Sequence, residues 1–192
     1  MTAKQQKAAS SETSGDELFG SLNNVFNLFI GNCTDEKVLL AAFDAIPTQS
    51  DSQRRWVTYW KANVLLALVS SNGDEIETGE LAKSWKRMKR ARQMLEQLTS
   101  VRTDRIPENE RELVFGAMIQ LGGILPDVSK SCDLLLRAAA LTRLHNSPLA
   151  DKAEAAYNHA CNLALRAKYA SLQEDQESDL IDQRMEQEGD AA

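Results

Sequence analysis

The chain has 192 residues, of which 43% are hydrophobic and 26% charged, which suits one globular domain and excludes a wholly disordered chain. Its cysteines, Cys33, Cys132 and Cys161, stand at spacings unlike those of a secreted disulfide framework or paired zinc knuckles. We therefore expect a reducing compartment, the cytoplasm, with the nucleus as an alternative. Met1 to Ser14 lacks the apolar core of a secretory signal and no apolar run is long enough to cross a bilayer, so no membrane span is expected.

The net charge of −6 is distributed unevenly along the chain. Residues 173–192 carry eight acidic side chains against one basic side chain, Arg184, which amounts to −7 and leaves the other residues at +1. This composition predicts an acidic disordered tail over 173–192, and the polar opening predicts a disordered segment over 1–13. A single α-helical domain is expected over 14–172.

Apolar residues recur at spacings of three and four through most of the chain, and no segment alternates with a period of two. This pattern predicts an all-α fold. Ser14 with Glu17 and Ser50 with Gln53 have the spacing of a capping box, so helices are expected to begin at both places. Pro47 stops the second helix. The predicted helices span residues 16–30, 35–46, 51–70, 80–100, 107–121, 127–144 and 147–172.

Three of these helices have faces that the sequence predicts. The helix over 51–70 is apolar on nearly all sides in its second half, so it is expected to be the central helix. The inner arc expected for the helix over 80–100 consists of Leu81, Trp85, Met88, Leu95 and Leu98. The last helix carries small residues beside Tyr157, where a neighbouring helix could approach closely. These are Ala153, Ala156, Ala160, Ala164 and Ala167.

The fifth and sixth predicted helices combine small and bulky residues in a recognisable pattern. The pattern comprises Phe115-Gly116, Ile119, Gly123, Leu135 and Ala138. It resembles a tetratricopeptide unit, a family that places small residues where its two helices touch. The resemblance covers about residues 51–168 and implies stacked helical hairpins, 51–70 with 80–100 and 107–121 with 127–144, capped by the last helix. It further implies a scaffold whose concave surface binds a peptide or another protein. Because the helix starts are unequally spaced, a compact helical bundle is the alternative.

The fourth helix carries four basic residues with helical spacing. Lys83, Lys86, Arg87 and Arg90 follow i, i+3, i+4 and i+7, so they are expected to line one face opposite Trp85. This basic stripe could bind an acidic protein segment, RNA phosphates or an anionic membrane surface. With Trp85 expected inside, no aromatic side chain is left for base stacking, which disfavours sequence-specific RNA recognition. The alternative is a solvated face that only aids solubility.

No catalytic signature is present in the sequence: there is no Gly-rich phosphate loop, nucleophile elbow or zinc-binding helix. His159 and Cys161 turn to different faces of a helix, so no metal site is expected. Because the catalytic motifs are missing, no other cofactor and no catalytic residue is expected either. The cysteines are expected to be buried and structural. The sequence thus favours a non-enzymatic protein-protein interaction adaptor or chaperone-like scaffold whose partner is another protein offering an acidic or helical segment.

Two other functions stay open. One is an RNA- or nucleic-acid-associated protein that binds phosphates through residues 83–92, with the acidic tail folding back as a competitor. The other is an enzyme whose site is assembled from unremarkable carboxylates. The oligomeric state is not determined by any feature of the sequence.

Overall fold

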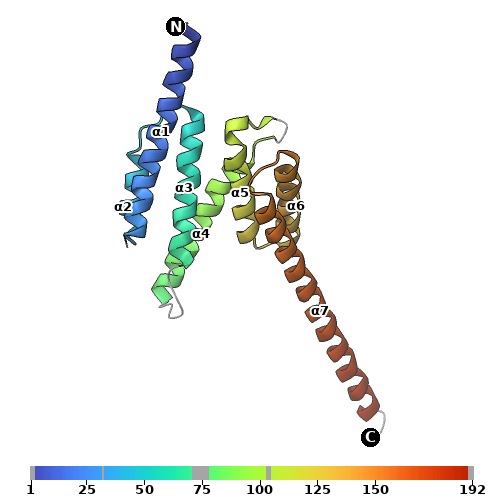
Figure 1. The fold of residues 1–192 in the computed structure, drawn as a ribbon. Coiled ribbons are helices and arrows are strands. Elements are labelled where there is room, and N and C mark those ends of the chain that lie inside the picture. The colour runs from blue at the N-terminus through green and yellow to red at the C-terminus, as the bar shows by residue number, and fades with distance from the viewer. Residues whose placement is uncertain (1–2, 32, 71–77, 103–104, 190–192) are drawn as a thin grey trace. The chain divides into compact units, whose positions relative to one another are not determined.

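The computed structural model describes the backbone of residues 3–31, 33–70, 78–102 and 105–189, and the surroundings of the side chains over 16–31, 33–70, 81–102 and 105–171 (Figure 1). Within these residues the fold is all-α, as predicted, with seven α-helices, one short 3-10 helix and no strand. In chain order the elements are α1 (Ala3–Ile30), α2 (Glu36–Asp44), α3 (Asp51–Ser70), α4 (Thr78–Thr99), η2 (Glu108–Glu110), α5 (Arg111–Ile124), α6 (Val128–Leu144) and α7 (Ala150–Gly189).

The ends of the first and last helices differ from the prediction. Helix α1 begins at Ala3, not near residue 16, and α7 continues to Gly189, not to about 172. The first extension is rich in Ala, Lys and Gln and the second in Gln and Glu, and neither contains a proline that would stop the helix. The predicted helix ends are therefore corrected, while the disorder expected in solution for 1–13 and 173–192 stays a prediction.

The two predicted capping boxes have different outcomes. Ser14 and Glu17 lie inside α1, so no helix begins there. At the start of α3, the backbone N–H of Gln53 donates to Ser50 Oγ at 3.2 Å. The side-chain Oε1 of Gln53 accepts from the backbone N–H of Gln49 at 2.6 Å. This pair satisfies backbone donors on both sides of the helix start, with the return bond one residue earlier than in the standard box.

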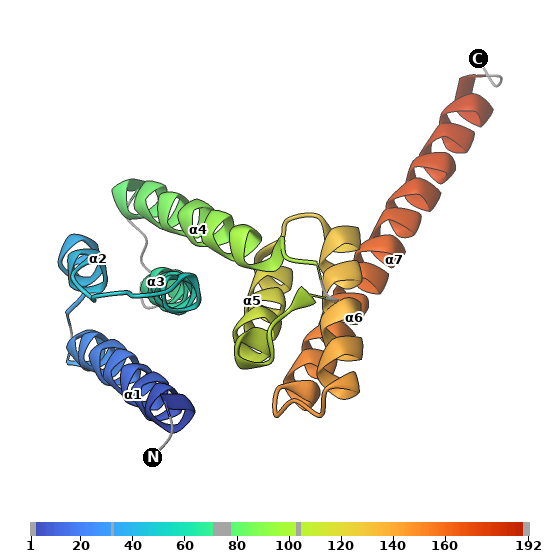
Figure 2. The ribbon, with the colours of Figure 1, turned by 90° about the horizontal axis from the view of Figure 1, so that it is seen from above.

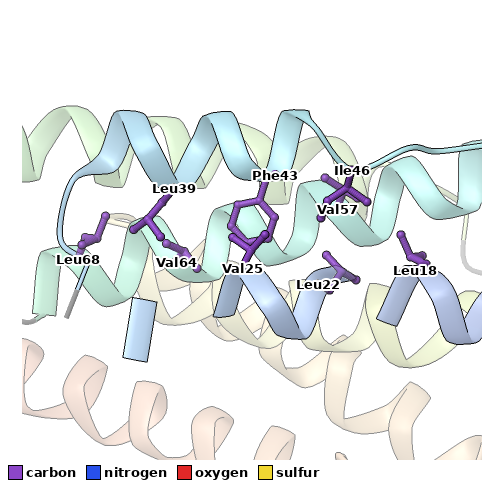
Figure 3. Close-up of a cluster of buried hydrophobic side chains, with 9 residues drawn as sticks. All are labelled: Leu18, Leu22, Val25, Leu39, Phe43, Ile46, Val57, Val64 and Leu68. Carbon is purple, nitrogen blue, oxygen red and sulfur yellow. The ribbon is translucent and has the colours of Figure 1, made fainter. Parts of the chain in front are cut away.

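The chain divides into two compact units, residues 1–121 and 122–192. Each unit contains a part of the single helical domain that was predicted over 14–172. In the first unit, α3 contacts α1, α2 and α4, which confirms its prediction as the central helix of that unit (Figure 2). Between α1, α2 and α3 lies a core of aliphatic side chains around Phe43 (Figure 3). It comprises Leu18, Leu22, Val25, Leu39, Phe43, Ile46, Val57, Val64 and Leu68.

Aromatic contacts and ion pairs fix the position of α3 in the first unit. Trp60 meets Phe26 of α1 edge to face, with ring centroids 5.4 Å apart. Arg55 forms a 2.7 Å ion pair with the buried Glu110 of η2, and its other terminal nitrogen donates to the Leu98 carbonyl at 3.2 Å. Because a buried carboxylate without a cation is costly, Arg55 is a structural residue that joins α3, α4 and η2.

The second unit is built on the packing of α6 against α7. Ala153 and Ala160 are buried, whereas Ala167 is exposed, so the predicted small-residue face is confirmed only in the first part of α7. The last turn of α5 also belongs to this unit. A Cβ atom at Gly122 would lie 2.5 Å from Leu135 Cγ, and Ser131 Oγ donates to the Gly122 carbonyl at 2.6 Å.

Neighbouring helices pack against one another in each unit, which is consistent with helical hairpins or a helical bundle. The contact of the 51–70 helix with the next helix is observed as α3 against α4. The expected role of Gly123 as a small contact residue is wrong, since a Cβ there would meet nothing within 4 Å. Gly122, one position earlier, makes the close approach. None of the helices searched in the described residues is long and apolar enough to cross a membrane.

Candidate interaction face on helix α4

Helix α4 packs against α3 through a face of two small residues and two leucines. Its buried positions are Ser84, Ala91, Leu95 and Leu98, at helical spacings of seven, four and three. Small side chains at Ser84 and Ala91 allow the two helix axes to approach closely, and Leu95 and Leu98 fill the space beyond them. Only this second half of α4 buries the large residues that were predicted to lie inside.

The first half of the predicted inner arc is wrong. Leu81, Trp85 and Met88 are 53%, 67% and 38% exposed. Trp85 precedes Ala91 by six residues, which turns it about 120° around the helix axis from the buried side. Large apolar residues alone do not predict the buried face of α4. The small pair Ser84 and Ala91, seven residues apart, marks the face that α3 covers.

The three exposed residues form an apolar stripe along the outside of α4. Leu81, Trp85 and Met88 follow i, i+4 and i+7, so their side chains lie in line over two turns of the helix. A single exposed apolar residue is ordinary, but a contiguous row that includes a tryptophan is typical of an interaction site. We therefore take the apolar stripe as the centre of the candidate site.

The basic stripe is divided between a structural and an exposed part. Arg87 is only 11% exposed, and its Nε donates to Glu36 Oε2 of α2 at 3.0 Å. Arg90 Nη1 lies 3.6 Å from the other oxygen of the same carboxylate. These two arginines thus join α4 to α2. The sequence could not show this pairing, because Glu36 is 51 residues from Arg87 and its register against α4 depends on the packing of both helices.

Lysines make up the more exposed part of the charge on α4. Lys83 and Lys86 of the basic stripe are exposed, and Lys89, one turn after Trp85, is exposed too. Lys89 therefore borders the apolar stripe, whereas Lys83 and Lys86 stand two and one positions from Trp85 and turn to other sides of the helix. The predicted partner-binding role of Lys83, Lys86, Arg87 and Arg90 stays a prediction. Trp85, in contrast, is an aromatic residue free for stacking or packing, contrary to the expectation from sequence.

A second concave feature lies in the first unit between α1, α3 and α5. This cleft has a volume of about 550 Å³ and is lined by Phe26, Phe29, Tyr59 and Trp60, among others. Gln120 Nε2 donates to Asn63 Oδ1 at 3.0 Å on its wall. Burial raises the pKa of the Tyr59 hydroxyl, so this group stays protonated and uncharged near neutral pH. The cleft is lined mainly by aromatic and aliphatic side chains, with Tyr59, Asn63 and Gln120 among its polar groups.

Comparison with known proteins identifies no relative of this chain. No family model matches it, and neither a curated protein nor a solved structure is significantly similar to it.

Proposed function

We propose that this protein is a non-enzymatic interaction adaptor that binds another protein through the outer face of α4. The observation that carries the proposal is the exposure of the apolar stripe, Leu81, Trp85 and Met88, on a helix that buries Ala91 and Leu95 against α3. Tryptophan contributes more than most residues to binding when a partner covers it. Methionine adds a flexible apolar side chain that adapts to different surfaces.

The chemistry of the face favours an acidic amphipathic helix as the partner. Anchors at i, i+4 and i+7 suit a helix that lies along α4 and interleaves its own apolar row with the stripe. The exposed Lys89, one turn after Trp85, would meet a carboxylate at the edge of the partner. Such rim charges mainly accelerate association and fix orientation, while the apolar contact supplies most of the affinity.

The tetratricopeptide resemblance is part of this proposal. Its support is the packing of α3 against α4 and the close helix contacts at two glycines, Gly116 against Tyr59 and Gly122 against Leu135. Small residues at helix contacts are the feature on which the resemblance rests. A scaffold of helical hairpins presents rigid outer faces, and a rigid face loses little conformational entropy when it binds a peptide.

The test compares Trp85→Ala with Tyr169→Ala, a matched control because Tyr169 is also aromatic, exposed and helical, at 66% against 67%. Binding of a fluorescent acidic amphipathic peptide is measured by anisotropy. Trp85→Ala should weaken binding by at least about tenfold, and Tyr169→Ala should leave it unchanged. Equal effects of the two substitutions, or no binding by the unmodified protein, would reject the proposal. Self-association in place of peptide binding would assign the stripe to a second copy of the chain.

Nucleic acid is the second candidate partner, and the exposure of Trp85 favours it more than the sequence did. An exposed indole one turn before the exposed Lys89 combines a stacking surface with phosphate-binding charge. Fluorescent single-stranded RNA in the same assay distinguishes the two partners. RNA binding that falls steeply with salt and is lost in Trp85→Ala, without peptide binding, would support this second function.

A further inference from the structure

Two of the three cysteines meet across the contact between α6 and α7. Cys132 Sγ lies 4.0 Å from Cys161 Sγ, although the residues are 29 positions apart in the chain. Both side chains are partly buried and both are free thiols. Cys33, the third cysteine, belongs to the other compact unit and is likewise partly buried. From the sequence, all three cysteines were expected to be buried structural residues, and no local pattern predicts this pair.

The packing around the pair holds the two thiols close together. Ala160, next to Cys161, is buried on the side of α7 that packs against α6, and its small side chain permits the close approach of the helices. A disulfide has a sulfur-sulfur bond of about 2.05 Å and tolerates a limited range of Cβ separations. From their separation of 4.0 Å, the two sulfur atoms must approach by about 2 Å for this bond to form.

Polar groups around the thiols influence their reactivity. Burial, followed by the neighbouring thiol of Cys161, raises the pKa of Cys132. The hydroxyl of Tyr157, one turn before Cys161, interacts with the Cys161 thiol, and this contact raises the pKa of the tyrosine. A thiol whose pKa is raised reacts slowly at neutral pH, since the thiolate is the nucleophile. Cys132 should therefore react slowly with a peroxide at neutral pH, and its reaction should accelerate as the pH rises.

We propose that Cys132 and Cys161 form a reversible redox modification site, which a peroxide oxidises to a disulfide between α6 and α7. One thiolate attacks the peroxide, breaks its O–O bond, and becomes a sulfenic acid as hydroxide leaves. The second thiol attacks that sulfur, the S–S bond forms, and the sulfenic oxygen leaves as water. The peroxide accepts two electrons, and two thiols with one hydrogen peroxide yield one disulfide and two waters. Thiol reductants reverse the reaction.

The disulfide would restrain α7 against α6. A cross-link that closes a loop of this length restricts the unfolded chain and raises stability. Oxidation should thus raise the melting temperature of the protein and slow proteolysis of the α6–α7 pair. Neither consequence depends on the proposed binding face of α4, so the two proposals fail independently.

Peptide mapping of the full chain tests the site directly. The protein is oxidised with hydrogen peroxide, its remaining thiols are alkylated, and it is digested with trypsin without reduction. Cleavage after Lys130, Arg137, Lys152 and Arg166 places the two cysteines on separate peptides. A linked species of peptides 131–137 and 153–166 is expected, lighter by about 2 Da than the sum of the two thiol peptides. Reduction should restore both peptides.

Cysteine variants and a denatured control complete the test. Cys33→Ser should form the linked species as the unmodified protein does, and Cys132→Ser or Cys161→Ser should abolish it. In guanidinium chloride all three pairings should appear, so a native preference for one pairing reports the folded geometry. Alkylation of both thiols after oxidation of the native protein, or disulfides to Cys33 in comparable yield, would overturn the proposal. This result comes from the unmodified protein and does not require the variants to fold.

Discussion

Adjacent glycines near the end of α5 have opposite surroundings. A Cβ at Gly122 would lie 2.5 Å from Leu135 Cγ, whereas one at Gly123 would meet nothing within 4 Å. Leu135 is buried and its Cγ is a branch point, so the side chain cannot move aside freely. Neither glycine has a positive φ, and alanine therefore fits both backbone conformations. The difference between the two positions is purely one of space.

Alanine substitutions at these glycines should change stability in opposite directions. Gly122→Ala should lower the free energy of unfolding by about 1–3 kcal/mol, because the added methyl group overpacks the contact with Leu135. Gly123→Ala should raise it by up to about 1 kcal/mol, because alanine has the higher helix propensity. Urea denaturation followed by circular dichroism measures both. A stabilising Gly122→Ala would show that the α5–α6 contact is looser than described.

At the scale of single helices, the sequence is informative where local signals act alone. The starts of α2, α3 and α6 follow polar caps, and the central place of α3 follows its apolar content. The orientation of α4 was predicted wrongly because it depends on which of its residues α3 can approach closely. The small side chains face α3, and Trp85 remains exposed. Contacts between distant positions, such as Arg87 with Glu36 and Cys132 with Cys161, need the assembled helices and have no local pattern.

The start of α6 gives a pH-dependent prediction. Asp127 caps this helix by accepting from the Lys130 amide at 3.1 Å, and that bond is the main reason why the pKa of Asp127 is lowered. A lowered pKa in the folded state means that the ionised cap stabilises the protein above the ordinary carboxyl pKa of about 3.9. The stabilisation is lost as the pH falls through the folded-state value.

Thermal melts of Asp127→Ala and the unmodified protein should reveal this dependence. The variant should melt at a lower temperature at pH 7, and the gap should narrow as the pH falls below about 4. Asp127→Asn keeps an oxygen acceptor without a titrating group, so it should stay close to the unmodified protein at pH 7. A gap for Asp127→Ala that is constant from pH 7 to pH 3 would contradict the assigned role of the carboxylate.

For the whole molecule, the uneven distribution of charge is the property that joins the acidic tail to the proposed binding face. Residues 173–192 carry −7 and the rest of the chain +1, and we propose that the carboxylates of the tail compete with an anionic ligand for the lysines of α4. Such competition is electrostatic. Dissolved ions weaken it at high salt, where the screening length falls to a few ångströms. Sequence alone predicts this imbalance fully, because it depends only on the positions of the charged residues along the chain.

Removal of residues 173–192 should therefore tighten binding of the acidic peptide to the proposed face at low salt. The affinity gain should disappear at about 1 M salt, where charges more than about 3 Å apart are screened. A full-length variant with the eight acidic residues of the tail changed to amides separates charge from bulk. If competition is electrostatic, this variant should bind as tightly as the truncated chain, since both lack the competing carboxylates. Unchanged affinity after truncation would leave the tail without a part in binding, and tighter binding by the truncated chain alone would assign the effect to steric hindrance.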